Sequence, residues 1–193
     1  MKLLLHSCCA PCSAPILENL ENQGIKPTIF YFNPNIFPFS EYEIRRNEIK
    51  KYAQKIGVNF IEGEYNHERW LNEVTGLENE PERGKRCLQC FKYRLAETAK
   101  MAANCGCDTI ATSLSSSRWK SLNQIDEAGK QAIEGYENLN YWAKNWRKNG
   151  LQQRRNELLK SNGFYNQLYC GCEFSQKNTR HFHLNNELNE QIN

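Results

Sequence analysis

Three groups of closely spaced cysteines, far apart along the chain, constrain what this sequence can fold into. They are Cys8-Cys9-Ala10-Pro11-Cys12, Cys87-Leu88-Gln89-Cys90 and Cys170-Gly171-Cys172. Thiolates bind soft transition metals, and six or seven converging sulfurs exceed the ligands of one tetrahedral zinc ion. The sequence therefore predicts a metal site assembled from all three groups, holding an iron–sulfur cluster or two neighbouring metals, and a function in redox chemistry.

The composition is typical of a globular protein that stays in the cell. The chain has 193 residues, nine cysteines, 39% hydrophobic and 24% charged residues. The first apolar run, at residues 3–5, is shorter than a signal-peptide core, and no stretch suits a membrane span. Clustered cysteines in a reducing cytosol are more often metal ligands than disulfides. We expect a cytoplasmic protein with one α/β metal-binding catalytic domain at 1–175 and a polar, flexible tail at 176–193.

Strand and helix patterns alternate along the chain. Short apolar runs typical of strands occupy residues 2–6, 27–32, 58–61 and 108–111. Apolar residues at helical spacing predict helices at 13–23, from an N-cap at Ser40 to Gly57, from Leu88 to Ala102, and after Ser121. This alternation predicts a Rossmann-like parallel sheet with helices on both faces. Ligands of such sheets bind beyond the carboxyl ends of the strands, where the first cysteine group falls.

The spacing within each cysteine group suggests how it binds. Neighbouring side chains diverge in extended backbone, so we expect Cys8 and Cys9 to serve two different centres. Cys87 and Cys90 would share one helix face near the positive end of the helix dipole, which favours thiolates. Gly171 permits a positive φ, so the backbone can wrap closely around a cluster.

A further pair, Cys105 and Cys107, falls in a predicted helix-to-strand connection. That connection lies away from the predicted crevice. We interpret the pair as structural or incidental.

Two loops and one basic segment carry residues suited to a nucleic acid. The loop Asn33 to Pro38 follows the second predicted strand and could frame a pocket, although a structural turn would look the same. The loop Thr112 to Lys120 follows the fourth predicted strand and could bind a phosphate or a sugar, or be only a solvated capping loop. The segment 143–160 carries a net charge of +5, with Trp142 and Trp146 at its start. Such a patch could hold phosphates while its aromatic faces stack on bases. The alternative is a solvated helix face with two core tryptophans.

Five motifs occur in order between residues 2 and 175. They are His6–Ser13, Tyr31–Ile36, Gly84–Phe91, Ser117–Lys120 and Tyr169–Cys172. Together they resemble the QueH-type epoxyqueuosine reductases. The resemblance implies a fold similar to the nucleotide alpha-hydrolase relatives of the Rossmann class. It implies reduction of the epoxide of epoxyqueuosine, at the wobble position of a tRNA with a GUN anticodon, to the alkene of queuosine.

The same resemblance implies a 4Fe-4S cluster beside one additional metal ion, expected to be iron. The implied metal ligands are Cys8, Cys9, Cys87, Cys90, Cys170 and Cys172. Cys12 is a further candidate, at a position near which some family members carry an acidic ligand.

Deoxygenation of an epoxide needs two electrons and two protons. We expect a ferredoxin or flavodoxin type of protein as the low-potential donor, and His6, Tyr169 or ordered water as the proton source. The residues expected to bind the substrate are Asn33, Asn35, Ser117, Arg118, Trp119, Lys120, Arg147 and Arg154.

Two other functions remain open from the sequence. A tRNA sulfurtransferase of the PP-loop type would share the architecture, but the loop after its first strand needs glycines and free amides, whereas Pro11 removes a donor here. A zinc-stapled RNA-binding module would be colourless, whereas a cluster protein is brown.

Overall fold

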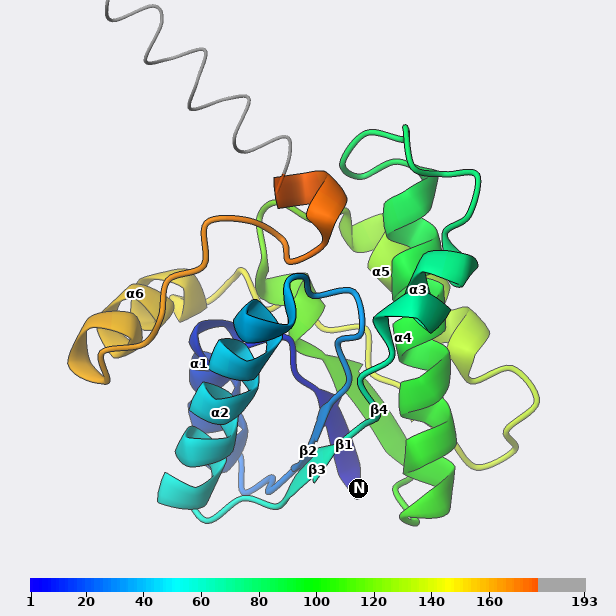
Figure 1. Cartoon of the computed structure of the whole chain (residues 1–193). Helices are drawn as coiled ribbons and strands as arrows, with labels where there is room; N and C mark the ends of the chain where they lie inside the picture. Colours follow the sequence, from blue (N-terminus) through cyan, green and yellow to red (C-terminus); the bar gives the residue numbers. More distant parts are fainter. Residues whose placement is uncertain (177–193) are drawn as a thin grey trace, which may run out of the picture.

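The computed structural model describes residues 1–176, which form a five-stranded parallel sheet between two layers of helices (Figure 1). Along the sheet the strand order is β3-β2-β1-β4-β5. The strands are β1 (Leu3–His6), β2 (Thr28–Tyr31), β3 (Phe60–Glu62), β4 (Thr109–Thr112) and β5 (Asn140–Tyr141). The predicted Rossmann-like parallel sheet is therefore confirmed.

Helices cover both faces of the sheet (Figure 1). One face carries α1 (Ala10–Glu21), α2 (Phe39–Lys55) and α6 (Leu151–Ser161). The other carries α3 (His67–Glu73), α4 (Lys85–Asn104) and α5 (Leu122–Ala132), and a 3₁₀ turn, η1 (Ser113–Ser116), follows β4. The predicted N-cap at Ser40 is wrong, because α2 begins at Phe39 and its N-cap is Pro38, two residues earlier.

The strands alternate their side chains between two cores. Leu4, Phe30 and Ile110 belong to the core beneath α4 and α5. Their neighbours Leu5 and Ile29, which pair across β1 and β2, belong to the core beneath α1 and α2. Each fully buried leucine or isoleucine stabilises the fold by about 1.5–3 kcal/mol. The central strand β1 is buried on both faces, which explains its continuous aliphatic run.

The strand order reverses direction between β1 and β4. The chain leaves β1 toward one side to form β2 and β3, and later returns to the other side of β1 to form β4 and β5. The loops after β1 and β4 therefore diverge at the carboxyl edge, where open parallel sheets bind their ligands. Cys8 and Cys9 lie in the first of these loops, and η1 begins the second.

No helix within residues 1–176 is both long and apolar enough to cross a lipid bilayer. The tail predicted to be flexible lies, from residue 177 onward, outside the described residues. The predicted domain boundary at residue 175 stays a prediction.

Candidate metal centre and substrate site

Cys8, Cys9 and Cys12, here called the three-sulfur group, lie where β1 turns into α1. Cys9 is the N-cap of α1, with an extended backbone (φ −174°, ψ 164°). The Sγ atoms of Cys8 and Cys9 are 3.7 Å apart, and all three buried sulfurs lie within 4.8 Å of one another. Two thiolates bound at about 2.3 Å to one tetrahedral ion lie about 3.8 Å apart. This spacing fits one shared ion, and the expectation that Cys8 and Cys9 serve different centres stays a prediction.

Cys87, Cys90, Cys170 and Cys172 form the second set, the four-sulfur group. The first two lie at the start of α4 and the last two in the segment after α6. Burial, together with a negative charge on Cys170, raises the pKa of Cys87 to about 11 and that of Cys172 to about 12. Within residues 1–176 only the three-sulfur group packs its ligand atoms within 4.8 Å. The wider spacing of the four-sulfur group suits a cluster, whose thiolates bind different irons.

Lys120 lies close to both sulfur groups. Burial lowers the pKa of its ammonium, but the negative charges of Cys170, Cys8 and Cys12 outweigh burial, so the pKa lies above its usual value. Cys170 comes from the four-sulfur group and the other two from the three-sulfur group. Members of both groups also pack in one buried cluster, which contains Cys8, Cys9, Cys12, Cys90 and Cys172 with Cys87 against it. The two groups therefore lie in the same part of the molecule, near a loop that the sequence assigns to the substrate.

Polar groups surround four of the sulfurs. A hydrogen bond to a metal-bound sulfur tunes the potential of the metal, and a nearby cation stabilises the thiolate. The pairs are Ser113 Oγ to Cys8 Sγ at 3.3 Å, Gln167 Nε2 to Cys9 Sγ at 2.7 Å, the Arg83 amide to Cys87 Sγ at 3.3 Å, and Arg94 Nη1 to Cys90 Sγ at 3.9 Å. Gln167 belongs to none of the sequence motifs, so its contact with Cys9 could not be predicted from the sequence.

The thiols of the three-sulfur group influence one another strongly. Hydrogen bonds from Cys12 and Cys9 hold the pKa of Cys8 well below its usual range, although burial opposes them. The hydrogen bond to Cys8 in turn raises the pKa of Cys12 to about 11. Burial raises the pKa of Cys9. A thiolate at Cys8 is therefore stabilised by the S–H protons of Cys9 and Cys12. A soft cation bound to the three sulfurs would replace those protons.

The residues present fit a metal site. The three-sulfur group is buried and close enough for one ion, sulfur is the donor that iron, zinc and copper(I) prefer, and hydrogen-bond donors with nearby cations offset the thiolate charges. The buried cysteine cluster can therefore bind a metal. Buried cysteines that act only as small apolar residues would need none of these donors.

The fully buried Arg45 of α2 holds the segment with the last two cysteines. Its guanidinium donates to the carbonyls of Cys170 at 3.1 Å and Tyr169 at 3.2 Å, and it forms an ion pair with Glu41 at 2.6 Å. Phe37 N donates to the carbonyl of Gly171 at 2.8 Å from the other side. The position of these cysteines is thus fixed by contacts far away in the sequence.

Both the backbone conformation and the surrounding atoms favour glycine at position 171. Its φ is +133°, a conformation that L side chains rarely adopt, and an added Cβ would lie 3.0 Å from Ile36 Cγ1 and 3.2 Å from Arg45 Nη1. We predict that Gly171→Ala lowers the free energy of unfolding by about 1–3 kcal/mol in urea titrations. In Gly106→Ala, the matched control, φ is +68° with no atom within 4 Å, so only the backbone cost of about 1 kcal/mol remains. Equal losses in both variants would mean that the contacts around Gly171 do not matter.

His6 is fully buried with both ring nitrogens in use. Nδ1 lies 2.8 Å from Thr112 Oγ1 and Nε2 lies 3.1 Å from the carbonyl oxygen of Phe32. Because a carbonyl only accepts, Nε2 carries the hydrogen and Nδ1 accepts from the threonine hydroxyl. Burial, aided by the charge of Arg94, lowers the pKa of His6 to about 3. The ring is therefore neutral and joins the ends of β1, β2 and β4, and its predicted catalytic role stays a prediction.

Tyr169 lies next to the four-sulfur group but points its hydroxyl toward the backbone. Its OH donates to the carbonyl oxygen of Phe37, and the Arg45 guanidinium lies 5.3 Å from its ring centroid. Burial and the charge of Glu41 raise the pKa of Tyr169 to about 12. A catalytic role for this tyrosine also stays a prediction, since proton transfer to a substrate would first require release of the hydrogen bond to Phe37.

Asn33 and Asn35 are buried in the loop after β2. Asn33 Nδ2 donates to the Ser7 carbonyl at 2.8 Å, and its Oδ1 accepts from Arg94. The buried Oδ1 of Asn35 has no hydrogen-bond partner within residues 1–176, and Asn35 lies beside Gly171. Asn33 thus supports the site, whereas the acceptor of Asn35 is unpaired, and substrate roles for both residues stay predictions.

The loop Ser117 to Lys120 follows η1, and its side chains differ in exposure. Arg118 is exposed, and Trp119 has 75% of its surface exposed, the largest value among the exposed large hydrophobic residues of the described chain. Ser117 and Lys120 are half-buried. An exposed indole beside two cations is suited to stack on an unpaired base.

The basic segment is less available than its charge suggests. Arg154 is held by Glu18 at 2.7 Å and Glu157 at 2.9 Å. Arg147 donates to the Lys120 carbonyl at 2.7 Å. The buried Trp146 packs in the core beneath α1 and α2. The interpretation of this tryptophan as a core residue is therefore confirmed, while substrate roles for the two arginines stay predictions.

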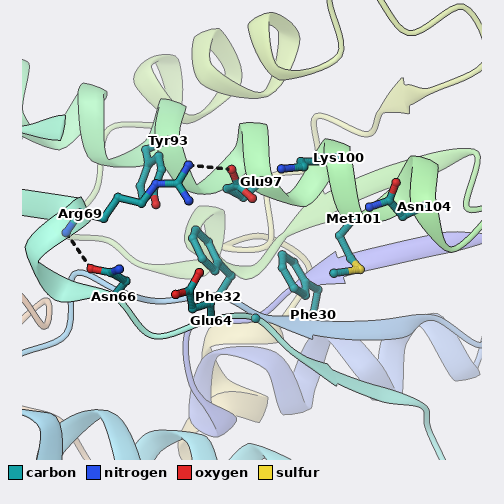
Figure 2. Close-up of a pocket in the computed structure, with 11 residues that line it drawn as sticks. Phe30, Phe32, Glu64, Asn66, Arg69, Tyr93, Glu97, Lys100, Met101 and Asn104 are labelled. Carbon is teal, nitrogen blue, oxygen red and sulfur yellow. Dashed lines mark hydrogen bonds and ion pairs between the residues drawn. The ribbon is translucent and has the colours of Figure 1, made fainter. Parts of the chain in front are cut away.

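A cavity of about 220 Å³ lies elsewhere, between β2 and the helices α3 and α4 (Figure 2). The parallel rings of Phe30 and Phe32, 5.8 Å apart, form its floor, and Arg69 pairs with Glu97 across its rim at 3.7 Å. Its lining residues include no cysteine. No sequence motif pointed to this cavity, and it is separate from both sulfur groups.

The remaining cysteine pair lies at the opposite edge of the sheet. Cys105 is the C-cap of α4, and its sulfur lies 3.4 Å from that of Cys107, just before β4. The predicted placement away from the crevice is thus confirmed. These two sulfurs belong to neither group.

Comparisons with known proteins agree with the arrangement of the site. The family model for epoxyqueuosine reductase QueH matches residues 3–178. Curated proteins named epoxyqueuosine reductase QueH include one from Histophilus somni, 46% identical over 92% of this chain and 73% of the relative. Another, from Acinetobacter baylyi, is 44% identical over 95% of this chain and 84% of the relative. One from Thermotoga maritima is 36% identical over 94% of this chain and 93% of the relative. The match spans all three cysteine groups.

Proposed function

Because the chain belongs to the epoxyqueuosine reductase QueH family, we infer that it reduces the epoxide of epoxyqueuosine in tRNA to the alkene of queuosine. The observation that supports this inference is that sulfurs from the start, middle and end of the chain pack in one buried cluster, in which Cys8, Cys9 and Cys12 lie close enough to hold an ion. The enzyme is accordingly an oxidoreductase that acts in tRNA processing.

The geometry supports a division of the sulfurs between two centres. The three-sulfur group matches one ion, and the four-sulfur group supplies the four thiolates that a 4Fe-4S cluster requires. When bound, the single metal ion would supply a Lewis acid, and the cluster would supply electrons one at a time. We propose iron for both centres, with a ferredoxin or flavodoxin type of protein as the donor.

The reaction breaks both carbon–oxygen bonds of the epoxide. Two electrons and two protons are consumed, the carbons form a double bond, and the oxygen leaves as water. The ammonium of Lys120 lies beside both sulfur groups and keeps its proton, because its pKa is raised by their charges. It can therefore hold the epoxide oxygen by a hydrogen bond while negative charge develops there. We propose that Asn35, whose buried Oδ1 has no hydrogen-bond partner within residues 1–176, helps to orient the base.

The activity can be tested directly with anaerobically reconstituted protein. Iron and sulfide are added, and the brown protein is incubated with epoxyqueuosine-containing tRNA with a GUN anticodon and a low-potential reductant. We expect nucleoside mass spectrometry to show the loss of one oxygen atom. Cluster-loaded protein that leaves the epoxide intact, while a known reductase converts it under the same conditions, would refute the proposal.

A sulfurtransferase of the PP-loop type is not favoured. The loop after β1 presents the three-sulfur group, and α1 begins with Ala10 and Pro11, so an amide that would hold pyrophosphate is missing. The family match names a reductase instead.

A further inference from the structure

Arg83 contacts the metal site through its backbone. It lies just before α4 with a φ of 65°, one of two non-glycine residues of the described chain with a positive φ. Its amide donates to Cys87 Sγ at 3.3 Å, and its carbonyl accepts from Gln124 Nε2 of α5 at 2.8 Å. Such a conformation costs of order 1 kcal/mol or more and persists where surrounding contacts impose it.

The side chain of Arg83 contacts the loop that carries Trp119. Its Nε donates to the Trp119 carbonyl at 3.0 Å, and its Nη2 donates to the Arg118 carbonyl, also at 3.0 Å. The planar fork of a guanidinium suits two adjacent carbonyls, which the single ammonium of a lysine cannot reproduce. Both hydrogen bonds involve a charged donor and are therefore strong.

Neighbouring carbonyls of this loop are also held by side chains from other elements. Gln152 Nε2 donates to the Ser116 carbonyl at 2.7 Å, and Arg147 Nη2 donates to the Lys120 carbonyl at 2.7 Å. Four of the five carbonyls from 116 to 120 thus accept from a distant side chain, and Ser117 accepts from the Lys120 amide. With its backbone fixed in this way, the loop presents an exposed indole.

We propose that Arg83 is a positioning residue that fixes the backbone carrying the indole of Trp119 relative to the metal ligand Cys87. The proposal rests on the proposed function, because it assumes that a substrate base stacks on Trp119. One residue thereby serves both sides of the site: its amide holds a ligand sulfur, and its guanidinium holds the stacking platform. Binding of the base then needs no further ordering of the loop.

Substitution can separate the two contacts of Arg83. Arg83→Gly keeps the amide and accepts the positive φ, so only the guanidinium contacts are lost. Arg83→Lys keeps the positive charge but lacks the two guanidinium donors that reach the adjacent carbonyls. Arg46→Ala is the matched control, since Arg46 forms partly exposed ion pairs with Glu43 and Glu62 on the outer side of α2.

Three measurements test the proposal in the metal-loaded protein. For Arg83→Gly we expect KM for the tRNA to rise about tenfold with kcat within about twofold, since the loop must now be ordered on binding. Tryptic cleavage after Arg118 and Lys120 should become about tenfold faster. The visible absorption of the metal centre should stay unchanged. Arg83→Lys should show most of the same effects, and Arg46→Ala none.

A double variant tests whether Arg83 acts through Trp119. Trp119→Ala alone should raise KM by about tenfold or more, the value of one stacked base. Adding Arg83→Gly should change KM by less than about twofold, because its effect passes through the missing ring. Independent, multiplying effects would overturn the proposal, as would unchanged KM and cleavage in Arg83→Gly, or loss of the metal absorption with an unchanged KM. Tryptic cleavage needs no turnover, so it tests the loop contacts even if the wild-type protein reduces no epoxide.

Discussion

Replacement of Cys90 with serine is expected to abolish both the brown colour and the turnover of the reconstituted protein. Cys90 is buried in the second turn of α4, close to Arg94, and belongs to the four-sulfur group. Loss of residues that only support a metal ligand costs about 10–100-fold in affinity or activity, so loss of a ligand should cost at least about a hundredfold. Iron content should fall by about four atoms per chain, while the ion of the three-sulfur group remains.

Two further cysteine variants sharpen this prediction. Cys105→Ser is the matched control, because Cys105 lies at the opposite edge of the sheet, and it should keep colour, iron content and turnover. Cys8→Ser should lose the single ion and turnover but keep the brown colour. Full activity in Cys90→Ser would remove that residue from the ligand set. Loss of the colour in Cys8→Ser would contradict the division of the sulfurs between two centres.

The second large effect is expected from Arg45→Met. Arg45 is buried, pairs with Glu41 at 2.6 Å and donates to the carbonyls of Tyr169 and Cys170. Its removal leaves a carboxylate buried without its partner, which costs about 3–5 kcal/mol of the free energy of unfolding. The segment with Cys170 also loses its anchor, so we expect turnover to fall by about a hundredfold or more. Urea titration and the queuosine assay measure the two effects separately.

The double variant Arg45→Met, Glu41→Gln distinguishes the two causes. Removing the charge of Glu41 should restore part of the stability, because no unpaired carboxylate remains. Turnover should stay low, since the carbonyls of Tyr169 and Cys170 still lack their donor. A single variant within about 1 kcal/mol of wild type, or a double variant with full turnover, would show that Arg45 does not position the segment.

The long elements of the fold could be predicted from the sequence, while several short ones could not. The aliphatic run before His6 and the helical spacing from Leu88 to Ala102 predicted β1 and α4. By contrast, β5 has two residues and α3 seven, too few to show a period, and α6 is largely polar. These elements are stabilised by packing against the rest of the molecule rather than by local preference.

The candidate site shows the same division. The cysteines themselves, and the loops that carry Asn35 and Trp119, stand out in the sequence because their chemistry is unusual. Gln167, which donates to Cys9, and Arg83, which donates to Cys87, do not, because an amide or a surface arginine is common anywhere. Their importance follows from the sulfur atoms to which they donate hydrogen bonds, and those contacts are seen only in the folded protein.

By itself, the sequence determined the alternation of strands and helices, the presence of many soft ligands and the resemblance to a family of reductases. Side-chain chemistry and periodicity are local properties, so they can be found without coordinates. Only the tertiary structure decided that Cys8 and Cys9 lie close enough to share one ion, and that Arg154 is occupied by carboxylates. Distances between segments far apart in the chain depend on how the helices pack on the sheet, which no local pattern encodes.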